Sequence, residues 1–184
     1  MSIVLASASP RRRELLEMMG LEFEIVPAKD ELDAEGLPPA EAVAKIALGK
    51  AMSVAKLRAE NDLVIAADTL VCLDGELLGK PKDEAEAKSM LMRLSGKTHQ
   101  VITGVCLTTA SMQKTFATVT DVTFAALTDE EVDYYVTRYQ PMDKAGSYGV
   151  QEWIGFVGVE NLSGSYFNVM GLPIQRLYTE LKKL

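Results

Sequence analysis

The chain has 184 residues, a formal charge of −7, 48% apolar residues and 24% charged residues. This composition is typical of a globular protein, and a chain of this length buries roughly 70% of its surface on folding. The negative charge argues against a protein that coats nucleic acid, and no apolar run approaches the ~20 residues that cross a membrane. We therefore expect neither nucleic acid nor a membrane as a partner.

The cysteines and the histidine restrict the chemistry further. Cys72 and Cys106 both lie inside apolar runs. We expect buried, reduced thiols, and with no basic signal-peptide region at the N-terminus we expect a cytoplasmic location. The single histidine, His99, cannot build a multi-histidine metal site. Any metal is therefore expected to be a hard cation held by carboxylates, such as Mg²⁺ or Mn²⁺.

In the first half of the chain, short apolar runs alternate with helical patterns. Ser9 is a good N-cap residue, and Pro10 suits the first position of a helix. Asp74 and Gly75 predict a hairpin turn. The expected elements are strands over 2–6, 23–26, 63–73 and 77–78, and helices over 10–19, about 40–59 and 83–94.

Strands dominate the second half. Those over 101–109 and 115–124 are expected to pair antiparallel, and Thr128 with Glu131 forms a capping box for a helix that ends near 139. A polar loop over 143–151 comes next. It is followed by a strand over 154–159 and a last helix over 173–184. The order of elements predicts an α/β fold with a mixed sheet.

Three consecutive arginines occupy the first turn of the helix over 10–19, where the helix dipole disfavours cations. A strand, a turn and a helix N-terminus form an arrangement that binds anions, so Arg11 and Arg12 are candidate phosphate-binding residues. Arg12 shares a helix face with apolar residues three, four and seven positions further on. Arg13 faces outward, and Glu17 at i+4 is its expected ion-pair partner.

Two further charged residues stand among apolar ones. Lys50 lies on the apolar face of the helix over 40–59, so it either extends to solvent or meets a buried anion. Asp68 interrupts the apolar run over 63–73. It stands either at a turn between two short strands, or within a strand where a cation or a metal compensates it. One carboxylate among arginines and lysines suits phosphoryl chemistry.

Several spaced segments together resemble the Maf family, the septum-formation-inhibitor homologues regarded as nucleoside triphosphate pyrophosphatases. The similarity covers essentially the whole chain. The segments that carry it are ASASPRRRELL at 6–16, DE at 30–31, KA at 50–51, AADT at 66–69, GKP at 79–81, LSGKTH at 94–99, DKAGSYGVQ at 143–151, and GSY at 164–166 with GLP at 171–173.

The resemblance implies one Maf-like domain over 1–184, with two lobes around a central cleft. It implies a long mixed sheet with flanking helices, similar to inosine triphosphatase-like folds. The implied activity cleaves the bond between the α- and β-phosphates of a nucleoside triphosphate, which releases a monophosphate and pyrophosphate. A divalent metal cation and a homodimer are implied as well.

Residue roles carry over by the same resemblance. Asp68 is the implied catalytic residue, and Glu31 with Asp68 the implied metal site. The implied phosphate-binding residues are Ser7, Ser9, Arg11, Arg12, Lys50 and Lys80. Arg12, Thr69 and Gln151 are the implied specificity residues.

Thr69 and Gln151 are similar to the branch of the family that prefers dTTP and UTP, whereas the branch acting on 7-methyl-GTP typically carries Gln and Glu there. Modified pyrimidine nucleotides remain open as substrates. A nucleotide-binding regulator of septum formation with incidental hydrolysis, or a 7-methyl-GTP pyrophosphatase, is the alternative function.

Overall fold

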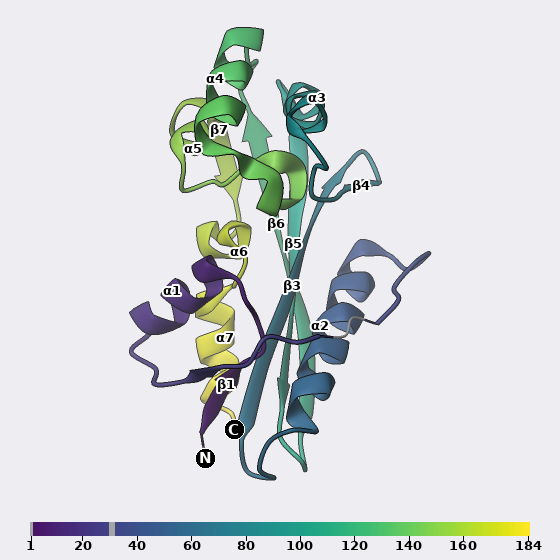
Figure 1. The fold of residues 1–184 in the computed structure, drawn as a ribbon, viewed down its shortest axis with the longest axis vertical. Helices are drawn as coiled ribbons and strands as arrows, with labels where there is room; N and C mark the ends of the chain where they lie inside the picture. The colour runs from purple at the N-terminus through teal and green to yellow at the C-terminus, as the bar shows by residue number, and fades with distance from the viewer. Residues whose placement is uncertain (1, 30–31) are drawn as a thin grey trace. The chain divides into compact units, whose positions relative to one another are not determined.

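The computed structural model describes residues 2–29 and 32–184, and within them it contains a seven-stranded sheet (Figure 1). Its order is β2-β1-β3-β5-β6-β7, and β4 pairs with β3 off this path. β1 runs parallel to β2 and β3, whereas the β3–β4 and β6–β7 pairs are antiparallel, so the sheet is mixed as predicted. The strands are β1 (Ile3–Leu5), β2 (Glu24–Ile25), β3 (Leu63–Leu73), β4 (Glu76–Leu78), β5 (Thr98–Thr108), β6 (Gln113–Phe124) and β7 (Val159–Ser163).

Most helices begin where the sequence predicts. Asp83 caps α3 by accepting a hydrogen bond from the Glu86 amide, and Thr128 with Glu131 forms the predicted capping box of α4. The helices are α1 (Pro10–Met18), α2 (Pro39–Ala55), α3 (Glu84–Leu94), α4 (Asp129–Tyr139), α5 (Trp153–Gly158), α6 (Tyr166–Met170) and α7 (Ile174–Leu181), with 3₁₀ turns at Pro141–Asp143 and Ala145–Ser147. In the described part of the chain, none of these helices has the length and apolarity needed to cross a membrane.

The chain folds into two compact units whose boundaries fall within β3, β5 and β6. The first unit contains the chain up to Thr69, together with Thr103–Thr118 and Gly171–Leu184. The second contains Leu70–Ile102 and Val119–Met170.

In the first unit, small side chains bring helix α2 close to the sheet. Ala47 and Ala51 of α2 are fully buried, and they belong to one apolar cluster with Val4 of β1 and Cys106 of β5. The approach is closest at Gly104 of β5, because a Cβ atom there would lie 2.4 Å from the backbone carbonyl of Val43 in α2. Figure 1 shows α2 on one side of β3, and α1 and α7 on the other. Residues of β3 can therefore meet a helix on either face.

Both cysteines are free and buried, as predicted. Burial raises the pKa of Cys106 to about 12, so its thiol stays protonated and unreactive at neutral pH.

The second unit has an aromatic centre. His99, Phe124 and Tyr148 form edge-to-face contacts, with ring centroids between 4.9 and 5.4 Å apart. Nε2 of His99 lies 2.6 Å from the Tyr148 hydroxyl. Burial lowers the pKa of His99 to about 4, so the ring is neutral at physiological pH. The single histidine is thus a core residue of this unit.

The predicted strand over 154–159 is wrong. Residues 153–158 form helix α5, and the strand, β7, follows it. Ile154 and Gly158 are buried four positions apart, whereas Phe156 and Val157 between them are exposed. This is the period of a helix, but so short an apolar run does not distinguish it from a strand in the sequence.

Candidate functional site

Asp68 lies in the middle of a continuous strand. β3 runs without a break from Leu63 to Leu73, so the alternative of a turn between two short strands is wrong. Lys50 of α2 compensates the carboxylate, with 2.8 Å between its Nζ and Asp68 Oδ1. The Lys50 side chain is 14% exposed and that of Asp68 is 17% exposed. The same contact explains a lysine on the apolar face of α2, which meets an anion there.

This pair offers two kinds of chemistry at one place. The carboxylate is a hydrogen-bond acceptor that can take a proton from water, and the ammonium group attracts phosphate oxygens. Since both side chains are mostly shielded from solvent, their interaction with a bound ion is stronger than at an open surface. The residues thus suit the reaction of an anionic substrate with water.

Arg12 anchors a second group of polar side chains. Its Nε donates to the carbonyl oxygen of Gly171 (2.8 Å), one terminal nitrogen to Ser7 Oγ (3.3 Å), and the other to Thr69 Oγ1 (3.0 Å). Thr69 Oγ1 lies 2.9 Å from Oγ1 of the buried Thr103. Arg12 therefore points inward as predicted, and it lies directly beside Thr69, another predicted specificity residue.

The two groups lie on opposite faces of β3. Asp68 and Thr69 are consecutive, and side chains alternate between the faces of a strand. Lys50 reaches Asp68 from α2, and Arg12 reaches Thr69 from α1, the helices seen on opposite sides in Figure 1. The structure thus brings Arg12 into direct contact with Thr69, one of the two other predicted specificity residues. A phosphate-binding role of Arg12 stays a prediction.

The start of α1 has the predicted strand–turn–helix form. Ser9 occupies the N-cap position, but its side chain makes no capping hydrogen bond. The Ser9 amide instead donates to Ser7 Oγ (3.2 Å), and Arg11 is half-buried on the first turn. The first amide groups of a helix point toward an anion placed before it. Ser7, Ser9 and Arg11 therefore surround one helix N-terminus.

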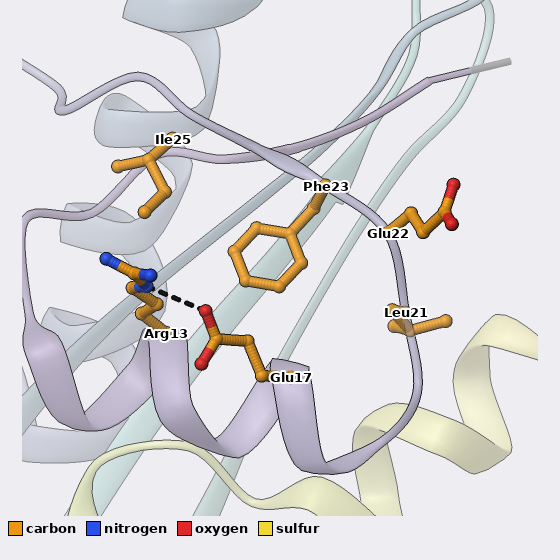
Figure 2. A pocket seen from close by; sticks show the side chains of 6 residues that line it. All are labelled: Arg13, Glu17, Leu21, Glu22, Phe23 and Ile25. Carbon is orange, nitrogen blue, oxygen red and sulfur yellow. Dashed lines mark hydrogen bonds and ion pairs between the residues drawn. The ribbon is translucent and has the colours of Figure 1, made fainter.

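Arg13 has the different role that its helical position predicts. Its Nε contacts Glu17 Oε1 at 2.7 Å, and both side chains are at least half exposed. The two residues line a shallow hollow of about 480 Å³, together with Leu21, Glu22, Phe23 and Ile25 (Figure 2). None of the predicted site residues is among those six. This hollow is not the candidate site.

Lys80 and Gln151 belong to the second unit. Lys80 is exposed, and the carbonyl of Gly79 before it accepts a hydrogen bond from the Gly146 amide at 3.1 Å. This bond ties the Lys80 segment to the loop that carries Gln151. The Gln151 side chain is half-buried, and its Oε1 has no hydrogen-bond partner in the part of the chain that the structure describes. An unpaired buried acceptor costs about 1–3 kcal/mol, which a ligand donor would offset.

The proposed metal partner of Asp68, Glu31, lies outside the described residues. Within residues 2–29 and 32–184, no group of three or more His, Cys, Asp or Glu side chains could hold a metal ion. Mg²⁺ usually binds through one or two carboxylates and the phosphates of its substrate, and Asp68 supplies suitable oxygens. The residues therefore suit a cation whose other ligands are triphosphate oxygens better than a cation bound by protein side chains alone.

Sequence reasoning missed Thr103 and Tyr135. Thr103 touches Thr69, and the Tyr135 hydroxyl accepts the Gly149 amide at 3.0 Å. A threonine in a strand and a tyrosine on a helix are ordinary core residues, so nothing in the sequence marks either of them.

Comparison with known proteins identifies the family. The Maf-like protein family model matches residues 2–184. The chain belongs to the Maf-like protein family. This agrees with the resemblance of its sequence motifs.

Several Maf relatives match over almost their entire length. The chain is 58% identical to proteins of Phocaeicola vulgatus and of Bacteroides fragilis, each named dTTP/UTP pyrophosphatase, with 99% of this chain and 95% of each relative covered. It is 49% identical to a protein of the same name from Bacillus cytotoxicus, over 98% of this chain and 94% of that one.

Among solved structures, the Maf fold is similar to that of Ham1 proteins. The Ham1 protein of Staphylococcus aureus has a TM-score of 0.58 at 18% identity, covering 100% of this chain and 99% of its own. A HAM1 protein from Coxiella burnetii has a TM-score of 0.57 at 17% identity, with 100% of both chains covered. These likenesses confirm the predicted fold class.

Proposed function

We propose that this Maf-family protein hydrolyses dTTP and UTP to the nucleoside monophosphate and pyrophosphate. The observation that carries the proposal is the 58% identity, over nearly full length, to relatives named dTTP/UTP pyrophosphatase. Two contacts support it: the predicted catalytic residue Asp68 meets Lys50, a predicted phosphate-binding residue, and the predicted specificity residues Arg12 and Thr69 meet each other.

The proposed reaction begins with water that attacks the α-phosphorus while the bond to the bridging oxygen breaks. Asp68 accepts the proton of that water, and Lys50 holds phosphate oxygens beside it. Arg11 and the hydroxyls of Ser7 and Ser9 stabilise the charge on the departing pyrophosphate, and Lys80 stays a predicted phosphate-binding residue. Asp68 and Glu31 would hold a divalent cation, which neutralises triphosphate charge when bound.

Base choice is assigned to Gln151. The edge of uracil or thymine presents acceptor, donor and acceptor at O2, N3–H and O4. A glutamine amide can both donate and accept, so it can pair with two neighbouring positions of that edge. A glutamate would place acceptors against carbonyl oxygens, at a cost of about 1–3 kcal/mol.

The test is pyrophosphate release from a panel of dTTP, UTP, CTP, ATP, GTP and 7-methyl-GTP. We expect fast release from dTTP and UTP and slow release from the others. Gln151→Glu should lower kcat/KM for UTP relative to 7-methyl-GTP by roughly ten-fold or more. A wild type that prefers 7-methyl-GTP, or that binds UTP without turning it over, contradicts the proposal. A homodimer and a cytoplasmic location stay predictions of the family resemblance.

A further inference from the structure

The residue proposed to read the base sits in a tight turn. The Glu152 amide donates to the Gly149 carbonyl at 3.0 Å, which closes a four-residue turn with Gln151 at its third position. Val150, the second residue of the turn, is buried. The backbone at Gln151 is therefore restrained by the hydrogen bond between Glu152 and Gly149 and by the burial of Val150.

One buried hydroxyl group contacts both ends of this turn. Tyr135 of α4 is fully buried, and its hydroxyl oxygen accepts the Gly149 amide at 3.0 Å. Burial above all raises the pKa of Tyr135; the hydrogen bond from the Gly149 amide opposes this rise, and the charge of Glu152 and a hydrogen bond to its carboxylate add to it. The hydroxyl thus keeps its proton at neutral pH and can donate it to the Glu152 carboxylate. Gly149 and Glu152, the first and last residues of the turn, share one partner.

The Glu152 carboxylate also forms an ion pair. Glu152 Oε1 lies 3.1 Å from Lys144 Nζ, and the two side chains are 17% and 12% exposed. Gly149 leaves room for this ion pair, because a Cβ atom there would lie 2.4 Å from Glu152 Oε1. The position of Glu152 thus depends on both Tyr135 and the absent side chain of Gly149.

We propose that Tyr135 is a positioning residue for base choice. Its hydroxyl group fixes the conformation of the turn from which Gln151 contacts the pyrimidine edge. Tyr135 touches no substrate atom in this proposal and acts through Gly149 and Glu152. The inference rests on the proposed function, since it assigns a determinant of specificity to that same site.

The experiment compares Tyr135→Phe with a matched control, Tyr139→Phe. Tyr139 stacks on Tyr135, with ring centroids 5.1 Å apart, so the control removes a hydroxyl from the same aromatic pair. UTP and CTP differ only at the base edge, so the ratio of their kcat/KM values reports reading of that edge. We expect this ratio to fall roughly five-fold in Tyr135→Phe, the factor that one hydrogen bond supplies, and to stay unchanged in Tyr139→Phe.

A second variant guards against loss of folding in Tyr135→Phe. Gly149→Ala leaves the Tyr135 hydroxyl group in place, but its Cβ atom would lie 2.4 Å from Glu152 Oε1 and would displace that carboxylate from its ion pair with Lys144. It should lower the UTP to CTP ratio in the same direction, with thermal unfolding of each variant measured in parallel.

The possible results are distinct. If kcat/KM falls equally for UTP and CTP in Tyr135→Phe and Gly149→Ala, the role of Tyr135 is merely structural and the inference is overturned. It is overturned as well if neither value changes. A wild type that releases no pyrophosphate from UTP or dTTP refutes the proposed function itself, and the inference with it.

Discussion

Replacing Asp68 by Asn separates catalysis from stability at the centre of the site. The change removes the negative charge that faces Lys50 Nζ at 2.8 Å and barely alters side-chain volume. If Asp68 accepts the proton of the attacking water, an amide cannot replace it. We expect kcat to fall at least ~10²-fold, the scale of general-base catalysis.

The cost to stability is much smaller. A hydrogen bond between two charged groups contributes about 1.5–3 kcal/mol, and one to a neutral amide roughly half of that. The amide oxygen of the introduced asparagine can still accept a hydrogen bond from Lys50, so we expect a loss of about 1–2 kcal/mol. For a chain of this size that corresponds to a fall in Tm of roughly 2–8 °C.

Asp62→Asn is the matched control. Asp62 Oδ2 lies 3.2 Å from Arg58 Nε, and the Asp62 side chain is 12% exposed, so it belongs to a comparable ion pair in the same unit. Pyrophosphate release at saturating UTP and thermal unfolding are measured for both variants. The control should lose similar stability and keep kcat within about two-fold. If Asp68→Asn also keeps its kcat, Asp68 is not the catalytic base.

Three further predictions concern the arginines of α1, Glu180 and Gly104. Arg12→Ala should lower kcat/KM for UTP by about ten-fold or more, because it removes three hydrogen bonds, whereas Arg13→Ala should leave it unchanged; steady-state kinetics that reverse this order contradict the helical-face argument. Hydrogen bonds from Lys114 above all, and then from Lys183 and Arg176, lower the pKa of Glu180 to about 2, so its contribution to stability is present above about pH 4.5 and is lost as the pH falls toward 2. In urea unfolding at pH 7, the Glu180→Gln variant should be less stable than the wild type, and between about pH 4.5 and 2 its free energy of unfolding should change less with pH. A variant whose stability depends on pH as the wild type's does refutes this. Gly104→Ala should destabilise the protein by about 1–3 kcal/mol or more, because its Cβ would meet the Val43 backbone rather than a movable side chain, and an unchanged Tm would show that α2 can shift.

Local signals in the sequence are sufficient to predict most of the helices and strands. The capping box at Thr128 and Glu131, Asp74-Gly75 at the β3–β4 hairpin and Pro10 at the start of α1 act within a few residues, so their effect can be read without the fold. Anomalous charges are visible for the same reason. Lys50 and Asp68 contradict their apolar surroundings, and the outward position of Arg13 follows from helical spacing alone.

Partners distant in the sequence depend on the tertiary structure. Nothing near Asp68 in the chain identifies Lys50 as its counterion, and Arg12 meets Gly171 only because α1 and the segment before α7 lie beside β3. The strand predicted over 154–159 fails because burial of Ile154 and Gly158, rather than local preference, decides its conformation. Tyr135 resembles any core tyrosine until the fold places Gly149 and Glu152 against its hydroxyl, since a hydrogen bond requires an approach that sequence spacing does not encode.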